Sequence, residues 1–292
     1  MLRPGAFQSM LGVVSIFCVT ACQLAAQSEA QNEISDAEVA VSSSRSDGGV
    51  SEAIKLPQAD EFQQLLQEAN AGSAEASYEV ADRYSKGSGF ADNEEKAFEY
   101  YKKAADQGLA KAQLAVGYSY DFGKGVEVNH EEAVKWYSLA ARPASSNAQY
   151  RLGVMYQTGV GVEKDMNEAI RWLSLAADSK FPYAYPRLGD IYRDSEGAFS
   201  APSKAQEMYL RGAVGGEQYS QVKLGLLYEE GIGVQQSNDN AFIWYKVAEL
   251  LGSPSGKQNA EIISADMDSS KLDDLVSEAQ LCIETKYSAC PN

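Results

Sequence analysis

The chain has 292 residues, with 25 Lys and Arg against 41 Asp and Glu, so its formal charge is −16; it contains one His and four Cys. Because a nucleic-acid-binding protein must neutralise phosphates with Lys and Arg, this balance argues against nucleic acid as a partner. A single His leaves little room for His-based catalysis or a transition-metal site. Composition therefore favours a non-catalytic acidic binding protein, and we expect no cofactor and no metal.

Residues 1–21 have the pattern of an export signal. Arg3 precedes an apolar run over residues 10–19, which is too short for a permanent membrane span and suits the hydrophobic part of a signal peptide. We therefore expect the chain to be exported, with contact to a membrane only through a lipid anchor.

The end of this signal resembles the lipobox of bacterial lipoproteins. Val19-Thr20-Ala21-Cys22 places small residues before a Cys that, in such proteins, is lipidated and becomes the mature N-terminus. Because Gln23 follows in place of Asp, the resemblance implies the periplasmic face of the outer membrane. The alternative is an ordinary signal cleaved at Ala21 or Ala26, which would give a soluble periplasmic or secreted protein.

Residues 22–56 have the composition of a disordered tether. They contain no aromatic residue, six acids and two bases, with Ser-rich and Gly-Gly stretches. Such a segment cannot bury enough apolar surface to offset the entropy of ordering it. It would hold the folded part away from a lipid surface.

Residues 73–252 contain five copies of a 36-residue pattern. Each copy has a pair of an apolar and a small residue, a Tyr four positions after the first member of that pair, an invariant Ala, and a closing pair of mostly small residues. The first pair stands at Val80-Ala81, Val116-Gly117, Leu152-Gly153, Leu188-Gly189 and Leu224-Gly225, and the invariant Ala at 97, 133, 169, 205 and 241. Five units without an insertion indicate a repeat protein.

Each unit has the spacing of a helix pair. Ala112, Val116 and Tyr120 fall on one helical face in the first half of a unit, and residues 133, 136, 137, 140 and 141 do so in the second half. Glycine-rich turns end the first helices. The second helices start at one column, where Asn93, Asn129, Asp165 and Ser237 are expected N-caps and the exception, Ala201, is followed by Pro202, which suits a first helical position. Helix pairs that cannot bury their apolar stripes alone stack into a solenoid.

These motifs resemble Sel1-like repeats. Ala148, Leu152-Gly153, Tyr156, Gly159-Val160-Gly161-Val162, Asp165, Ala169, Trp172-Leu173 and Ala176-Ala177 carry nearly all of the family pattern. The resemblance implies an all-α fold, an α/α superhelical solenoid, acting as a protein-interaction scaffold. Tetratricopeptide repeats have a period of 34 and lack the glycine-rich turn. In the fourth unit Ser195 replaces a turn glycine, so the family pattern does not predict the geometry of that turn.

Residues outside the five units are expected to cap them. Residues 57–72 are predicted to form an N-terminal capping helix, and residues 253–292 to form C-terminal capping helices near 256–266 and 271–284, the latter capped by Ser269 or Ser270. In an exported protein Cys282 and Cys290 are expected to form a disulfide, with two free thiols as the alternative. The helix must then end between them, because eight helical residues would separate their Cα atoms by about 12 Å.

The candidate partner-binding residues lie on the first helices. Arg151, Arg187 and Lys223 occupy one column of successive repeats, and Tyr118 lies on a neighbouring column. In a solenoid one row of helices lines the concave face, which is the usual recognition surface, and we expect the partner to bind there. Arg offers bidentate contacts to a carboxylate of a protein or peptide partner. The alternative is a solvated face whose bases pair with acids such as Asp190.

Other functions have weaker sequence support. Ser220-Gln221-Val222-Lys223 matches the S-x-x-K of a β-lactamase-like hydrolase, but no S-D-N or K-T-G accompanies it, and Ser220 occupies a buried packing column. Cell-wall or polysaccharide binding would require exposed aromatics on the first helices, where Tyr78, Tyr118 and Tyr150 qualify. We expect His130 to be an exposed residue of a first turn. The sequence therefore favours a non-catalytic scaffold tethered in the bacterial cell envelope.

Overall fold

The computed structural model describes residues 57–87, 93–142, 145–194, 199–265 and 267–291. The expected signal, Cys22, the tether and Ser195 lie outside the described residues. Within the described ranges the chain forms thirteen α-helices and no strand. None of these helices is both long and apolar enough to cross a bilayer.

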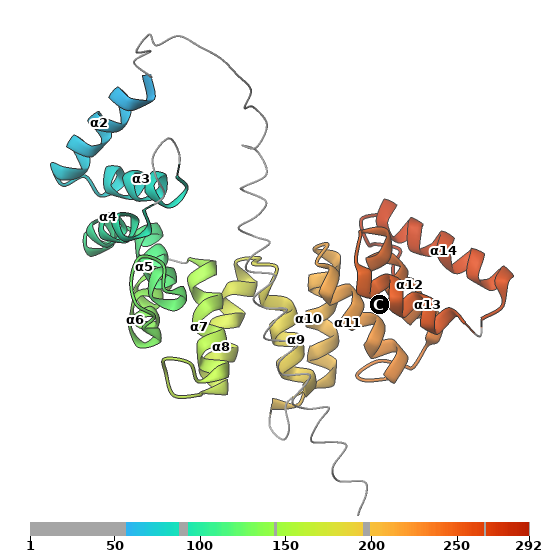
Figure 1. Cartoon of the computed structure of the whole chain (residues 1–292). Helices are drawn as coiled ribbons and strands as arrows, with labels where there is room; N and C mark the ends of the chain where they lie inside the picture. The colour runs from blue at the N-terminus through green and yellow to red at the C-terminus, as the bar shows by residue number, and fades with distance from the viewer. Residues whose placement is uncertain (1–56, 88–92, 143–144, 195–198, 266, 292) are drawn as a thin grey trace, which may run out of the picture. The chain divides into compact units, whose positions relative to one another are not determined.

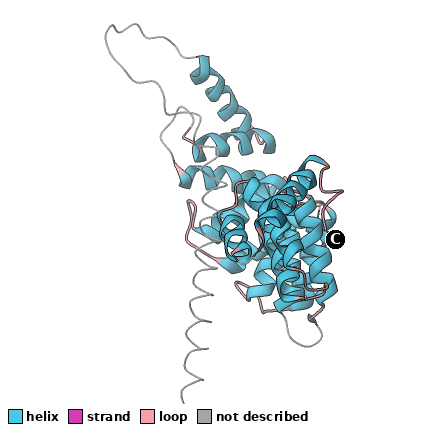
Figure 2. Cartoon of the chain, turned by 90° about the vertical axis from the view of Figure 1, so that its right-hand side faces the viewer, coloured by secondary structure: helices cyan, strands magenta, loops and turns pink. Residues whose placement is uncertain are grey.

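Ten of the helices form five antiparallel pairs (Figure 1). The first helices of the pairs are α3 (Ala74–Ser85), α5 (Ala110–Phe122), α7 (Ser146–Thr158), α9 (Ala184–Asp194) and α11 (Gln218–Glu230). The second helices are α4 (Glu94–Asp106), α6 (His130–Ala141), α8 (Met166–Asp178), α10 (Pro202–Val214) and α12 (Asn238–Leu250). The helix α2 (Pro57–Asn70) precedes the pairs, and α13 (Pro254–Ser264) and α14 (Ser269–Glu284) follow them. Each helix from α2 to α12 packs against the next one in the chain, and α14 packs against α12, as in a solenoid (Figure 2).

The helix ends follow the expected capping chemistry. The side chains of Asn93, Asn129, Asp165 and Ser237 accept backbone N–H groups of the second helices, whereas Ala201 makes no such bond and is followed by Pro202. At α14 the prediction was wrong, because Asp268 rather than Ser269 or Ser270 is the cap, and its Oδ1 accepts the Ser270 N–H at 2.9 Å. A Ser pair directly after an Asp offers three residue types that are good caps, and α14 uses the first of them.

The small residue of the apolar–small pair makes room for the ring of the second helix. A Cβ added at Gly225 would lie 2.6 Å from Cε1 of Tyr245, and one at Gly189 would lie 2.4 Å from Cε1 of Tyr209. Both rings are fully buried. The close approach of the two helices of a pair therefore depends on these glycines.

The turn glycines join one repeat to the next. Gly161 has φ +70°, and a Cβ on it would lie 2.3 Å from the backbone oxygen of His130 at the start of α6. The turn between α7 and α8 therefore rests directly on the previous second helix. Only glycine satisfies both the positive φ and this backbone contact.

A polar column that our sequence analysis did not identify also joins the repeats. Nε2 of Gln113, Gln149 and Gln221 donates to the backbone oxygens of Ala105, Ala141 and Ala213 at 3.4, 3.3 and 3.2 Å. In the fourth repeat the Tyr185 hydroxyl makes the same bond to Ala177 at 2.9 Å. Each of these buried side chains therefore satisfies a carbonyl at the end of the preceding second helix, where intrahelical donors are lacking.

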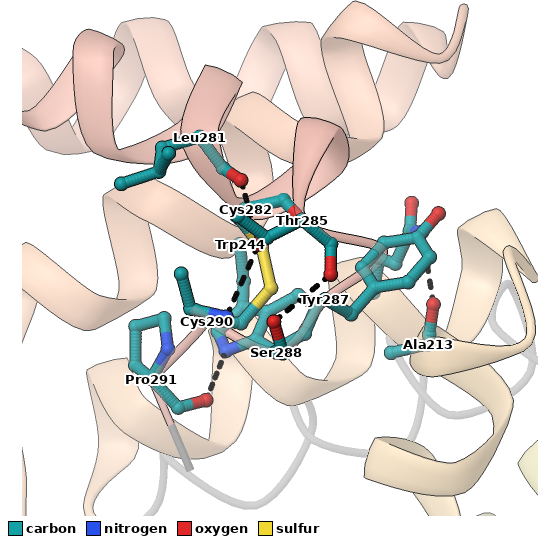
Figure 3. Close-up of a disulfide and its surroundings, with 11 residues drawn as sticks. Ala213, Trp244, Leu281, Cys282, Thr285, Tyr287, Ser288, Cys290 and Pro291 are labelled. Atoms are coloured by element: carbon teal, nitrogen blue, oxygen red, sulfur yellow. Dashed lines mark hydrogen bonds between the residues drawn. A yellow bond between two sulfur atoms is a disulfide. The ribbon is translucent and has the colours of Figure 1, made fainter.

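The C-terminal segment closes back onto the last repeat. The helix α14 ends at Glu284, and Lys286 and Tyr287 adopt positive φ values of 50° and 69°. This turn brings Cys290 to Cys282, where the two form a buried disulfide with a Cα–Cα distance of 4.9 Å (Figure 3). Just beyond it, the Pro291 carbonyl accepts a hydrogen bond of 3.1 Å from Nε1 of Trp244. The segment after α14 thus covers the end of the repeat array.

Candidate functional site

One stripe of each first helix is largely exposed or half-buried, although some of its side chains reach the second helices, as Tyr78 does with Tyr101 at 5.4 Å between ring centroids. Positions 75, 78, 79 and 82 of α3 and its C-cap position 86 follow i, i+3, i+4, i+7 and i+11 spacing, and the same columns recur every 36 residues along the chain. We call these columns on α3, α5, α7, α9 and α11 the first-helix row. All four predicted partner-binding residues, Arg151, Arg187, Lys223 and Tyr118, lie on it and are half-buried.

Arg151 is held against two aromatic rings of the neighbouring repeat. Its guanidinium carbon lies 4.8 Å from the ring centroid of Tyr118 and 5.1 Å from that of Phe122, and Nε and Nη2 each lie 3.3 Å from the Tyr118 hydroxyl oxygen. Burial lowers the pKa of Arg151, but nearby Tyr118, Tyr137 and Asp121 raise it above its ordinary value. The guanidinium therefore stays charged and is oriented by aromatic stacking.

Lys223 belongs to a polar cluster around Asp190. Its Nζ lies 3.9 Å from Oδ1 of Asp190, which also accepts the hydroxyl of Tyr209 at 2.6 Å. Tyr219 donates to Oδ2 of Asp190 at 3.1 Å, and Lys223 Nζ lies 4.9 Å from the Tyr219 ring centroid. Burial raises the pKa of Asp190, while these hydrogen bonds and Lys223 oppose the rise. The alternative expectation of an acid-paired base therefore holds for Lys223.

Aromatic contacts bridge the other first helices as well. Lys111 on α5 places Nζ 4.1 Å from the ring centroid of Tyr78 on α3. Tyr150 on α7 lies against Phe181 and Tyr183 before α9, with centroid distances of 5.2 and 6.5 Å. Aromatic or cation–aromatic contacts thus join α3 to α5, α5 to α7, and α7 to the segment before α9, whereas α9 and α11 are joined through Asp190.

The exposed aromatics differ from those predicted. Tyr78, Tyr118 and Tyr150 are half-buried under these neighbours, whereas Phe122, Tyr183 and Tyr219 are 44%, 38% and 40% exposed. Repeat spacing alone places residues on the row but does not show which side chain of the next repeat covers them. The Tyr118 ring already stacks against Phe122, at a centroid distance of 5.7 Å, and against the guanidinium of Arg151.

His130 lies in the first turn of α6 with its side chain 41% exposed, as predicted. The structure adds one contact, since Nδ1 lies 3.2 Å from Oδ1 of Asp121 on the preceding helix. Asp121 also accepts the hydroxyl of Tyr137 at 3.1 Å. The acid is supplied by the first helix of the same repeat, nine residues earlier, which a helix-cap argument does not consider.

The Tyr137–Asp121 bond is one member of a repeated set. Tyr245 donates to Glu229 at 2.6 Å, and the hydroxyls of Tyr101 and Ser85 lie 3.3 Å apart, at the same two columns. Burial raises the pKa of Tyr101 to about 12, so this hydroxyl stays protonated at neutral pH. In the third repeat Leu173 replaces the Tyr, and within the described ranges the Oε1 atom of Gln157 is buried without a hydrogen-bond partner. The sequence does contain a signal for these bonds, because Asp121 and Glu229 stand in one column and their partners Tyr137 and Tyr245 in another.

The residues of the hydrolase alternative do not form a nucleophilic site. Ser220 is fully buried on α11, and a Cβ added to Gly212 would lie 2.2 Å from its Oγ. The Nζ of Lys223 instead lies near Asp190 and Tyr219. Among the described residues, no group of three or more His, Cys, Asp or Glu side chains could hold a metal ion.

The stacked helix pairs and the turn glycines define an α/α repeat protein with the architecture of a solenoid. The Sel1 repeat matches residues 74–109, 110–142, 146–181, 182–215 and 218–253, which together are more than half of the chain. The chain therefore belongs to the Sel1 repeat family. Proteins of this family are generally scaffolds for protein–protein interaction, and the fold is generally non-catalytic.

Two solved structures resemble this chain. The crystal structure of c5321, a protective antigen present in uropathogenic Escherichia coli strains that displays an SLR fold, is 30% identical with a TM-score of 0.67, over 75% of this chain and 48% of that one. A Sel1 repeat protein from Oxalobacter formigenes is 27% identical with a TM-score of 0.61, over 76% of this chain and 99% of that one. The match thus spans about half the length of the antigen. No curated protein sequence matches the chain.

Proposed function

We propose that this protein is a non-catalytic scaffold of the bacterial cell envelope, which binds an acidic segment of a protein partner on the α5–α7 part of the first-helix row. The observation that carries the proposal is the stacked Arg151, whose guanidinium is oriented by Tyr118 and Phe122 on the neighbouring repeat. Within the described ranges, Nη1 of Arg151 makes no hydrogen bond, so it can donate to a carboxylate together with Nη2.

Local charge supports this choice of surface. The α5 and α7 columns carry Lys111 and Arg151 and no acid, whereas the α3 columns carry Glu75, Glu79 and Asp82. In a chain with a formal charge of −16, most of the surface repels an acidic partner, so a basic and aromatic surface on two adjacent helices would determine where such a partner docks. The exposed ring of Phe122 supplies apolar area beside the cation.

A pair of photo-crosslinking variants tests the location of the partner. Benzoylphenylalanine replaces Phe122 in one variant and Leu175 on α8 in the other, two residues that are 44% and 38% exposed. We expect a discrete adduct in cells from position 122 and none from position 175. Equal adduct patterns at the two positions would contradict a partner site on the first-helix row.

A charge reversal tests the role of Arg151. The Arg151→Glu variant is expected to lose most of the position-122 adduct, because it places a carboxylate where the partner carboxylate would bind. The control is Arg171→Glu, since Arg171 also stacks on an aromatic ring, with its guanidinium carbon 4.1 Å from the Trp172 centroid, but lies on a second helix. Unchanged adduct yield in Arg151→Glu, with normal circular dichroism, would reject the acidic-partner proposal.

The envelope location rests on the sequence of the signal and lipobox. We propose that Cys22 carries the lipid and that residues 22–56 tether the repeats to the periplasmic face of the outer membrane. Radioactive palmitate should label the wild type and not Cys22→Ala. Labelling of neither protein would favour the soluble periplasmic or secreted alternative, while leaving the partner site on the repeats untouched.

A further inference from the structure

A cavity of about 530 Å³ opens where the fourth repeat meets the fifth. It lies beside α10, the end of α11 and the turn into α12, and its size falls in the range of small-molecule sites, roughly 300–1,000 Å³. The lining residues are Gln206, Tyr228, Gly233, Val234, Gln235, Gln236, Ser237 and Asn240.

The cavity exists where an apolar side chain is missing. In the α4–α5 contact, Phe98 packs edge-on against Tyr120 with a centroid distance of 5.3 Å. The positions equivalent to Phe98 in the next two repeats are Val134 and Ile170, which join the same hydrophobic clusters as the following tyrosines. In the fourth repeat this position is Gln206, which faces the cavity beside Tyr228. A polar side chain thus replaces the apolar one found at this position in the three preceding repeats.

The contact between the fourth and fifth repeats also lacks the acidic side chains that stand at the equivalent positions of earlier repeats. In the second and third repeats, the positions equivalent to Gln235 and Asn240 are acids. These acids are Glu127 and Glu132 in the second repeat and Glu163 and Glu168 in the third. Around the cavity every lining side chain is uncharged, in a chain with 41 Asp and Glu. A charged ligand would therefore be desolvated here without a counter-ion.

Several polar atoms at the cavity are left without protein partners. Tyr228 is 3% exposed, and its buried hydroxyl has no hydrogen-bond partner among the described residues. In the same ranges the side-chain amides of Gln206, Gln235 and Asn240 make no hydrogen bond, while Gln236 donates to the Glu229 backbone oxygen. An amide both donates and accepts, as a hydroxyl does, so these groups match a ligand rich in neutral hydroxyls.

We propose that this cavity binds one uncharged sugar ring, held by the amides of Gln206, Gln235 and Asn240 and the hydroxyl of Tyr228. The ring belongs either to a free monosaccharide or to the end of a glycan. This inference is independent of the partner site on α5–α7, which lies on different repeats.

Binding is tested on the purified full chain with named probes. Saturation-transfer NMR compares N-acetylglucosamine and glucose with glucuronate, and chitohexaose represents the same sugar at the end of a chain. We expect signals from at least one neutral monosaccharide and none from glucuronate. A stronger signal per ring from chitohexaose would identify a glycan end as the source, and equal signals a free sugar. Absence of signal from every neutral probe, or an equal signal from glucuronate, would overturn the proposal.

Variants then place the ligand in this cavity. Gln206→Phe introduces the residue found at position 98 and fills the space, so binding should be lost while the melting temperature is kept or raised. Tyr228→Phe removes only the unpartnered hydroxyl and should weaken binding about five- to tenfold.

A charge variant separates loss of the site from loss of the fold. Asn240→Glu introduces the acid found at positions 132 and 168, and we expect it to abolish binding without filling the cavity. Gln258→Glu, which introduces the same carboxylate on the exposed face of α13, is the control and should bind like the wild type. Wild-type affinity in Gln206→Phe or in Asn240→Glu would overturn the assignment.

Discussion

The two ends of the repeat array are closed in different ways. At the N-terminal end, α2 packs mainly against α3, and Phe62 and Ala69 are buried among its described side chains. The partly buried Leu65 and Leu66 add to this apolar contact, and an exposed ion pair of 3.0 Å between Arg83 and Glu61 also joins the two helices. At the C-terminal end, α12 buries seven residues and is covered by α11, α13 and α14. The second end is also closed covalently, between Cys282 and Cys290.

This difference indicates where unfolding begins. In a repeat protein each unit is stabilised chiefly by its neighbours, so a weakly coupled end can open while the rest stays folded. Surface ion pairs contribute about 0–1 kcal/mol, which is small beside the burial of a large aromatic side chain. We therefore expect α2 to exchange its amide hydrogens before α12 does.

The largest effect is expected from Trp244→Ala. Trp244 is fully buried and donates to Pro291 at 3.1 Å, so its loss should lower the free energy of unfolding by about 3–5 kcal/mol. The matched variant is Phe62→Ala, since Phe62 is 1% exposed at the other end. It should speed exchange in α2 and barely move the main thermal transition. Equal shifts of the main transition in the two variants would show that both ends unfold together with the array.

Removal of the disulfide is expected to have an intermediate effect. Replacing Cys282 and Cys290 by Ser together frees a loop of nine residues, which should cost about 2–3 kcal/mol through the larger entropy of the unfolded chain. Hydrogen exchange should quicken in α14 and at Tyr287, whose hydroxyl lies 3.4 Å from Nε2 of Gln221. Exchange in α2 should not change. If α14 keeps its protection in the double Ser variant, the C-terminal end is closed by packing alone.

Most of the fold could be predicted because the same sequence pattern occurs in five successive repeats. The columns of Ala169 and Leu152 are buried as expected, and the predicted N-caps bind as expected because capping depends on neighbouring residues in the chain. Errors appeared where no repeat supplies a precedent. The start of α14 is one example, since Asp268, Ser269 and Ser270 are all good N-caps and neither their types nor a repeated column distinguishes them.

The site was less predictable, because its contacts join different repeats. The column of Arg151 was evident from the spacing, but its stacking on Tyr118 depends on how two first helices are placed side by side. The cavity at Gln206 was not recognised either. Its polar replacement of an apolar column is visible in the sequence, whereas the space it leaves depends on whether a neighbour such as Tyr228 moves in.

The smallest effect is expected from the titration of Asp268, and it again concerns only the C-terminal end. Hydrogen bonds from the side chain and backbone of Ser270, and from the backbone of Lys271, lower the pKa of Asp268 below its ordinary value of 3.8. A lowered pKa means that the carboxylate stabilises α14 at pH values above 3.8, and that this contribution is lost as the pH falls through the folded-state pKa. Asn is also a good N-cap and does not titrate, so Asp268→Asn should keep α14 at neutral pH and remove this part of the acid sensitivity. Hydrogen exchange of α14, compared between about pH 5 and about pH 2.5, should show a smaller loss of protection in the variant than in the wild type. Identical losses in the two proteins would mean that other carboxylates govern how this end opens in acid.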